Sequence, residues 1–407
     1  MSNRNGVWSL IAQYQAIADT DWNMAPGAPT GVSGTAGNTQ SVVSFTAPTF
    51  AGIPGTITGF KVTSSSGQTA TGSSSPITVT GLTNGNAVTF TAQAQNAIGF
   101  GKASDASSSV TPEFPQRAFF MGGVITVSPD RTDEIDVFDI TSTGNASDWG
   151  NLSTACDNNS GCASSTRGIC FQGRTPTKVN TIDYFSVASS GNATDFGDNN
   201  VSTQGTASVS NSTRGLEAGG EQSNGLNRIS YITIASAGNA QDFGDLSQGR
   251  ADFKGGAANS TRGVFGGGGN YSSSSLFNLD VIDYVTIGST GNASSFGDLT
   301  EGRNGCSASS NDTRGIWAGG NNTNIIDYIT IASAGNATDF GDLPSTSYSL
   351  GASAAGLTRA LIGATTNNSD TVSYVTIAST GNASDFGDLQ QDKRNPGSCS
   401  SAHGGVA

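Results

Sequence analysis

The segment SAGNATDFGDL, from Ser333 to Leu343, recurs through the C-terminal part of this 407-residue chain. Near-copies begin at Ser189, Ser236, Ser289 and Ser379. The glycine of the shared Gly-Asn-Ala tripeptide stands at Gly144, Gly191, Gly238, Gly291, Gly335 and Gly381, so successive copies are 47, 47, 53, 44 and 46 residues apart. A period in the forties indicates one supersecondary unit per repeat. Six copies of one motif indicate a repeated structural unit rather than a catalytic site.

Each repeat contains four stretches with the pattern of β-strands. One repeat begins with small residues, GCSASS from Gly305, and continues with RGIWAGG from Arg314. Its third stretch, IDYITIAS, starts at Ile326, and the S-x-G-N-A turn joins it to the fourth, DFGDL. Gly-Asn suits a tight turn because both residues tolerate positive φ. Four strands in each of six repeats predict a six-bladed β-propeller over residues 116–407.

The two ends of this region predict how the propeller closes. It opens with RAFFMGG from Arg117, which lacks a small-residue strand before it. It finishes with GSCSS from Gly397, a small-residue strand with no complete repeat after it. We therefore expect the C-terminal strand to complete the first blade, which removes the open sheet edge of a linear array.

The order of the four stretches resembles kelch repeats. The resemblance rests on a double glycine after the second strand, an aromatic-x-x-Leu motif in the fourth, and a following arginine. Examples are Gly319 with Gly320, Phe340 with Leu343, and Arg250 and Arg303. Phe replaces the family's Trp in most repeats, and Trp149 is the exception. The resemblance implies a kelch-like propeller.

Residues 25–113 have the alternating short runs of a β-sandwich of about 90 residues. They resemble a fibronectin type III domain through Pro29, Phe45, Pro48, TGF from Thr58, LTNG from Leu82, AQNAIG from Ala94, and Ser104. Phe45 and Phe60 stand where the family usually has Trp and Tyr, and Val88 stands at the place of its corner tyrosine. We expect the fold to survive because volume and pattern are kept. The resemblance implies a spacer or adhesive module.

Residues 1–24 form a separate N-terminal segment, which Pro26 and Pro29 divide from the sandwich. Its apolar residues fall at helical spacing and are candidate anchor contacts: Trp8, Leu10, Ile11, Tyr14 and Ile17. One short amphipathic helix is too short to be stable alone. We expect it to dock either on the same chain or on a partner that holds the protein by this end.

Composition excludes several classes of function. The net charge of −13 and the lack of a Lys/Arg cluster give no basis for nucleic-acid binding. No apolar run approaches the roughly 20 residues of a membrane span, and the N-terminus lacks the pattern of a signal peptide. The five cysteines show no CxxC pair. Cys156 and Cys162 are close enough in sequence to bridge a loop, although we favour free thiols.

No catalytic, cofactor-binding or metal-binding set is predicted. The single histidine, His403, excludes the two-imidazole copper site known in the kelch-like group, and it has no supporting nucleophile motif. Carboxylate pairs recur in four repeats, which favours turn capping over catalysis, with weak Ca²⁺ binding left open. They are Asp195 and Asp198, Asp242 and Asp245, Asp339 and Asp342, and Asp385 and Asp388.

One arginine per repeat opens the second strand, and a closed propeller places the six in a ring. They are Arg117, Arg167, Arg214, Arg262, Arg314 and Arg359. We expect a structural role, in which each bonds neighbouring backbone or Asp. A ring that binds anions or acidic glycans is the alternative.

The combination of anchor, sandwich and repeated propeller resembles the appendage proteins of tailed bacteriophages. That resemblance implies a non-enzymatic structural component of a virion, in a tail, fibre or capsid appendage, assembled in the host cytoplasm and working outside it. Its partners would be other virion proteins at residues 1–24 and a glycan of the host surface. The alternatives are a bacterial surface or secreted glycan-binding adhesin, and an enzyme acting on polysaccharide.

Overall fold

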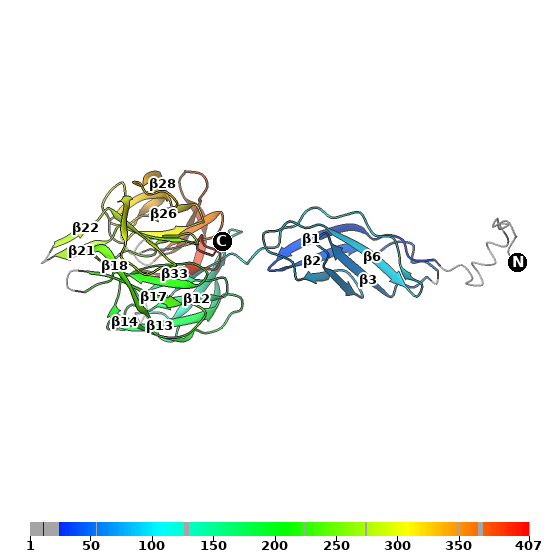
Figure 1. The fold of residues 1–407 in the computed structure, drawn as a ribbon, viewed down its shortest axis with the longest axis horizontal. Coiled ribbons are helices and arrows are strands. Elements are labelled where there is room, and N and C mark those ends of the chain that lie inside the picture. The colour runs from blue at the N-terminus through cyan, green and yellow to red at the C-terminus, as the bar shows by residue number, and fades with distance from the viewer. Residues whose placement is uncertain are drawn as a thin grey trace. The chain divides into compact units, whose positions relative to one another are not determined.

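The computed structural model describes residue 11 and residues 24–53, 55–125, 130–222, 225–272, 275–347, 351–364 and 369–406. The chain divides into two compact units, Met1–Pro115 and Gln116–Ala407. Every element with defined bounds among the described residues is a β-strand (Figure 1). The predicted all-β class is therefore confirmed.

The first unit is a sandwich of two antiparallel sheets, with strand orders β1-β2-β5 and β4-β3-β6-β7. The strands are β1 (Thr30–Gly37), β2 (Gln40–Thr46), β3 (Gly59–Ser64), β4 (Thr69–Gly72), β5 (Ile77–Thr80), β6 (Phe90–Asn96) and β7 (Gly99–Phe100). Alternate residues of β2 and β6 are buried, as expected of strands with one face in a core. Phe45 and Phe60 pack in that core with ring centroids 5.0 Å apart, and Val88 is buried at the place of the corner tyrosine.

The second unit contains six four-stranded sheets in the described residues. Sheet 1 comprises β10 (Ser147–Asn151), β9 (Glu134–Asp139), β8 (Arg117–Met121) and β33 (Gly397–Ser400). Sheet 2 comprises β11 (Ser160–Ala163), β12 (Arg167–Phe171), β13 (Val179–Ser186) and β14 (Thr194–Thr203). Sheet 3 comprises β15 (Ala207–Ser210), β16 (Arg214–Ala218), β17 (Leu226–Thr233) and β18 (Gln241–Arg250).

The remaining sheets follow the same order of strands. Sheet 4 comprises β19 (Ala257–Ala258), β20 (Arg262–Gly266), β23 (Val281–Thr286) and β24 (Ser294–Asp298), and the hairpin β21 (Gly269–Ser272) and β22 (Ser275–Asn278) is inserted in it. Sheet 5 comprises β25 (Ser307–Ser310), β26 (Arg314–Ala318), β27 (Thr323–Thr330) and β28 (Thr338–Ser347). Sheet 6 comprises β29 (Ala352–Ala355), β30 (Arg359–Gly363), β31 (Ser369–Thr376) and β32 (Ser384–Lys393).

The last strand of the chain lies in the first sheet. β33 pairs antiparallel with β8, with Gly397 opposite Met121 and Ser400 opposite Ala118. We call β33, β11, β15, β19, β25 and β29 the inner strands. They contact one another in that order, and β29 contacts β33 again, so the series returns to its start.

Serine side chains join neighbouring inner strands of different sheets. The Ser210 hydroxyl donates to the carbonyl of Ala163 and accepts from its N–H, although the two residues belong to different sheets. Equivalent bonds run from Ser208 to Gly161, from Ser310 to Ala258 and from Ser398 to Ser353. Larger side chains would hold these backbones apart, which explains the small-residue composition of this strand in every repeat.

Adjacent sheets also fit together by matching the sizes of two side chains. At four junctions, the fourth residue of a second strand packs near the fifth residue of the second strand in the preceding sheet. A Cβ added at Gly266 would lie 2.7 Å from Trp317 Nε1, and one at Gly363 would lie 3.1 Å from Phe120. Ala218 shares a hydrophobic cluster with Phe265, and Ala318 shares one with Ile362. At these four junctions a small fifth residue thus accommodates a large fourth one, whereas sheets 1 and 2 carry the larger Met121 and Phe171 at the fifth position.

We expect Gly266→Ala to destabilise the second unit by about 1–3 kcal/mol, because the new methyl group overpacks against the Trp317 indole. The double variant Gly266→Ala with Trp317→Phe should lose less stability than the sum of the two single losses. We expect the difference to be at least about 0.5 kcal/mol in urea unfolding. Gly288→Ala is the matched control, since a Cβ there meets nothing within 4 Å. Strict additivity of the two core substitutions would contradict the proposed fit.

Buried ion pairs form a third link between sheets. Arg250, at the end of β18, places Nη2 2.8 Å from Asp283 Oδ2 in β23 of the next sheet, and neither side chain is exposed. Its Nη1 donates to the carbonyl of Val281 at 2.7 Å. Arg303 with Asp327, and Lys393 with Asp136, repeat the arrangement at two other junctions.

Candidate functional site

The predicted anchor contacts fall almost entirely outside the described residues. Trp8, Leu10, Tyr14 and Ile17 lie there, and of the five candidates only Ile11 is described, with 82% of its surface exposed. Among the described residues, none forms a helix long and apolar enough to span a membrane.

The six repeated arginines lie one at each junction between sheets. Each guanidinium stacks 4.7–4.9 Å from the centroid of an aromatic ring in its own sheet. Each Nη1 also donates to a carbonyl that follows the third strand of the next sheet. The pairs are Arg117 with Val187, Arg167 with Ile234, Arg214 with Ile287, Arg262 with Ile331, Arg314 with Ile377, and Arg359 with Ile140. The arginines therefore hold neighbouring sheets together.

One of these arginines borders a surface depression. Arg214 lines a hollow of about 280 Å³ together with Tyr231, Gln241 and the turn that contains Asn239. The Tyr231 hydroxyl donates to Gln241 Oε1 at 2.6 Å. The other five repeats carry Ser or Thr at the position of Gln241, for example Thr194, so the glutamine beside this hollow is particular to sheet 3.

The Asn of each S-x-G-N-A turn has a structural role. Asn192 Oδ1 accepts from the N–H of Asn151 in the preceding sheet, and Asn145 accepts in the same way from Asp388. Equivalent bonds are made by Asn239, Asn292, Asn336 and Asn382. The repeated aspartates, such as Asp195, lie at exposed or half-exposed positions of the fourth strands. No group of three or more His, Cys, Asp or Glu side chains in the described part of the chain could hold a metal ion.

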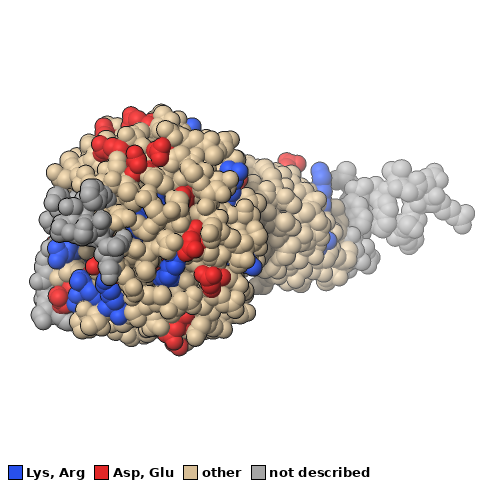
Figure 2. Space-filling view, turned by 60° about the vertical axis from the view of Figure 1, so that its left-hand side comes forward, with Lys and Arg blue, Asp and Glu red and all other residues tan. Residues whose placement is uncertain are grey.

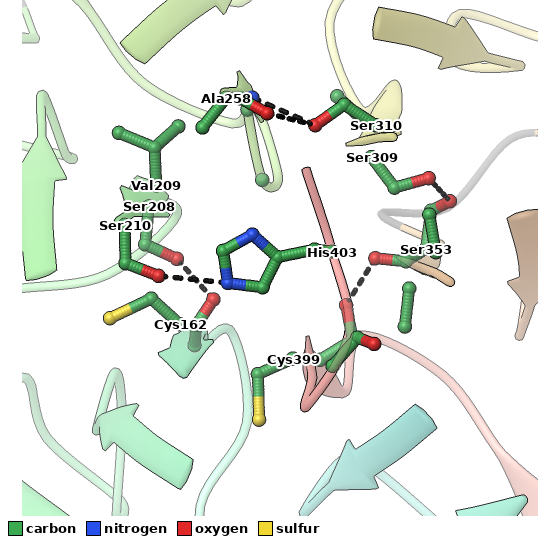
Figure 3. A pocket seen from close by; sticks show the side chains of 18 residues that line it. Cys162, Ser208, Val209, Ser210, Ala258, Ser309, Ser310, Ser353, Cys399 and His403 are labelled. Carbon is green, nitrogen blue, oxygen red and sulfur yellow. Dashed lines mark hydrogen bonds between the residues drawn. The ribbon is translucent and has the colours of Figure 1, made fainter. Parts of the chain in front are cut away.

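The inner strands surround a small cavity. Its volume is about 40 Å³, and its lining consists of serine, alanine and glycine with Val209, Cys162, Cys399 and His403 (Figure 3). That volume suits a few water molecules and is far below the roughly 300 Å³ at which ligand pockets begin. Burial raises the pKa of Cys162 to about 12 and that of Cys399 well above its usual value, so neither thiol supplies a nucleophile at neutral pH.

The ring of His403 lies at this cavity and points toward the inner strands of sheets 2 and 3 (Figure 3). The Gly405 N–H donates to its Nδ1 at 3.0 Å, so Nδ1 is an acceptor and Nε2 carries the hydrogen. Nε2 lies 2.9 Å from the Ala163 carbonyl and 3.1 Å from Ser210 Oγ. The next residue, Gly404, donates its N–H to the Ser310 carbonyl. Burial lowers the pKa of His403 below its ordinary value of 6.5, which keeps the ring neutral.

We expect the residues around His403 to loosen in mild acid. A histidine with a lowered folded pKa contributes its full stability above pH 6.5 and loses it as the pH falls toward the folded value. Protonation of Nδ1 would also remove the bond from Gly405. Hydrogen exchange at Gly404 and Gly405, corrected for intrinsic rates, should therefore quicken between pH 7 and pH 5. His403→Gln should flatten that dependence, and an unchanged profile in the variant would contradict the assignment.

A charged group lies at the other end of the inner strands. The Lys254 ammonium, which precedes β19, donates to the carbonyls of Asn395 at 2.9 Å and Pro396 at 3.1 Å, just before β33. Burial lowers the pKa of Lys254 to about 8. Burial opposes ionisation of Asp157, but hydrogen bonds from Arg174 and Arg131 outweigh it and hold its pKa below the usual range. Sequence inspection missed this group, because its members lie far apart in the chain and do not repeat.

The two ends of the sheets differ in regularity. The connections between third and fourth strands span seven residues in all six sheets: 140–146, 187–193, 234–240, 287–293, 331–337 and 377–383. At the opposite end, the connections between second and third strands run from four residues, 319–322, to fourteen, 267–280. We call this opposite end the variable end.

Comparison with known proteins identifies one family in the chain. Residues 27–110 match the fibronectin type III domain, which confirms the resemblance in the sandwich and places it within the predicted 25–113. No curated protein matches the sequence.

Proposed function

We propose that residues 116–407 form a closed six-bladed kelch-like β-propeller. Three observations support this reading. The inner strands contact one another in a series that returns to its start. β33 supplies the strand that sheet 1 lacks. The links through arginine and asparagine also run from sheet 6 to sheet 1, at Arg359 with Ile140 and at Asn145 with Asp388.

We propose further that the chain is a structural component of a bacteriophage particle, in a tail, fibre or capsid appendage. In this role residues 1–24 attach to the particle, and the propeller recognises a glycan of the host surface. The observation that carries the proposal is the contrast between the two ends of the sheets. The connections at one end all have the same length, because their asparagine side chains and carbonyl groups bond to the neighbouring sheet. The connections at the variable end are not constrained in this way and can differ to contact a ligand.

The surface is consistent with a polar, weakly charged ligand. Charged residues make up 12% of the chain, and most of the surface in the view of Figure 2 is uncharged. The variable connections, such as 319–322, are rich in Asn, Ser, Thr and Gly, whose amide and hydroxyl groups can pair with sugar hydroxyls. The hollow beside Arg214 is a second place where an acidic sugar could bind.

Immunoelectron microscopy tests the proposal. Antibodies against the full chain should label particles purified after lysis and leave the envelope of uninfected cells unlabelled. Label on uninfected cells would support the adhesin instead. Incubation of the full chain with host polysaccharide should leave the length of the polymer unchanged, and shortened chains would support the enzyme.

A further inference from the structure

The buried ion pair that joins sheet 6 to sheet 1 differs from those at the other junctions. Its cation is Lys393, the last residue of β32, and its anion is Asp136 in β9, with Nζ 2.7 Å from Oδ2 and neither side chain exposed. Sheet 3 has Arg250 at the position of Lys393, and that guanidinium donates to the Val281 carbonyl as well as to Asp283. A lysine amine that has lost its proton is a nucleophile, whereas an arginine guanidinium keeps its charge in proteins. The lysine junction can therefore support a reaction that the arginine junctions cannot.

The contact between Lys393 Nζ and Asp136 Oδ2 is short but is not a hydrogen bond. Neither atom has a hydrogen-bond partner among the described residues, so the two atoms touch without the alignment that such a bond needs. A buried ammonium without hydrogen bonds costs free energy. Transfer of one proton from Nζ to Oδ2 removes both charges and leaves an amine against a carboxylic acid. These are the two groups that condense to an amide.

A second carboxylate lies beside this pair. Glu134 stands two residues before Asp136 in β9, on the same face of the strand, and its Oε2 lies 3.7 Å from Lys393 Nζ. Its side chain is 34% exposed, so it can exchange protons with solvent. The corresponding residues beside the two buried Arg–Asp pairs are Val281 and Ile325, which carry no proton acceptor in their side chains. The lysine and a carboxylate able to carry its proton thus occur at the same junction.

Two glutamine side chains orient the carboxyl groups. Gln390 Nε2 donates to Asp136 Oδ1 at 2.9 Å, and Gln391 Nε2 donates to Glu134 Oε2. When an amine adds to a carboxyl carbon, negative charge develops on one of the carboxyl oxygens. A donor already fixed on Oδ1 stabilises that charge and leaves Oδ2 as the oxygen that departs.

We propose that Lys393 and Asp136 condense to an intramolecular isopeptide bond, with Glu134 as the proton carrier. The neutral Nζ adds to Cγ of the protonated Asp136. Glu134 takes a proton from Nζ and returns it to the Oδ2 hydroxyl, which leaves as water. The Nζ–Cγ bond forms, the Cγ–Oδ2 bond breaks, and no oxidant is needed. Groups held in contact react as though their concentration were about 10⁵–10⁸ M, which favours the condensation.

The bond joins β9 covalently to β32, at the junction where the last sheet of the series meets the first. The two residues are far apart in the chain, so the bond encloses nearly all of the second unit in one covalent loop. It would keep sheet 6 attached to sheet 1 even when the hydrogen bonds between them are broken.

Mass spectrometry of the purified full chain tests the proposal. The intact mass should be one water molecule below the mass of the sequence. Trypsin digestion of the unfolded protein should release residues 132–167 and 360–394 as one linked species, because an acylated Lys393 is no longer a cleavage site. The undiminished sequence mass, with peptides 132–167 and 360–393 separate, would overturn the proposal.

Two variants separate the bond from the fold. Lys393→Arg keeps a buried cation and copies the junction at Arg250, so it should fold with its full mass and release the two peptides separately. On a denaturing gel, it should migrate more slowly than the linked natural chain. Glu134→Gln keeps the ion pair and should lower the linked fraction at least tenfold after equal incubation. Loss of water in Lys393→Arg would place the change at other residues and overturn the proposal. An unchanged linked fraction in Glu134→Gln would overturn the role of Glu134.

Discussion

Deletion of residues 397–407 is expected to abolish the cooperative melting transition of the second unit, or to lower it by at least about 10 °C. The deletion removes β33, so β8 becomes an open edge and loses the pairing that runs from Met121 to Ala118. It also removes Cys399 from the cluster that contains Phe119 and leaves a void there. A loss of about 6 kcal/mol corresponds to a shift of about 10 °C in a unit of nearly 300 residues.

Two controls accompany this deletion: a shorter deletion that keeps β33, and the melting transition of the first unit in the same sample. Deleting residues 404–407 keeps β33 and should cost much less. The fibronectin type III domain folds as a separate compact unit, so its own transition should be the same in every variant. Differential scanning calorimetry separates the two transitions. An unchanged transition of the second unit after the long deletion would show that β33 is not needed for closure.

The second large effect is expected at the buried ion pair between sheets 3 and 4. Asp283→Ala should destabilise the second unit by about 3–5 kcal/mol, because it leaves the fully buried Arg250 guanidinium without its counter-charge. The Ser247 hydroxyl and N–H also lose their acceptor at 2.8 and 3.1 Å. Urea unfolding of the full chain, followed by tryptophan fluorescence, measures the change.

The matched variants distinguish a lost charge pair from a lost contact. Replacing both partners, in Asp283→Leu with Arg250→Met, should recover most of the stability because no buried charge is then unpaired. Glu221→Ala removes a partly exposed partner of Lys178 and should cost less than about 1 kcal/mol. A loss as small for Asp283→Ala as for Glu221→Ala would contradict the structural role of the buried pair.

Sequence periodicity was sufficient to predict the order of the strands, but not the side-chain contacts that join neighbouring sheets. The repeat gave the order of four strands in each sheet, because burial and turn chemistry act within one repeat. The arginine of each second strand was correctly expected to have backbone partners as one alternative, but its aromatic partner was not foreseen. In sheet 1 this partner is Trp149 in place of a tyrosine, since Val137 stands at the tyrosine position. Only the spatial arrangement shows that one change compensates the other.

Irregular repeats show the same limit at another junction. Ser230 stands where four other repeats have a buried aspartate, and Thr203 stands at the position of Arg250. The structure replaces this lost pair with Glu217 and Arg228, whose Oε2 and Nη2 lie 2.7 Å apart. A buried glutamate in a strand of apolar residues is unexpected from the sequence. Its partner, Arg228, lies on the neighbouring strand of the same sheet, two residues before the position opposite Glu217, and the repeat pattern does not predict it. The partners of His403 and Lys254 could not be predicted from the sequence either, because they lie far away along the chain.

The central claim is that the last strand of the chain closes a ring of six sheets. A cryo-electron microscopy map of the full chain tests it most directly. The account predicts β33 hydrogen-bonded to β8, with Ser398 opposite Phe120, and six four-stranded sheets around a single axis. A map with β33 detached or paired in another chain, or with the sheets in an open stack or in a different number, would contradict it.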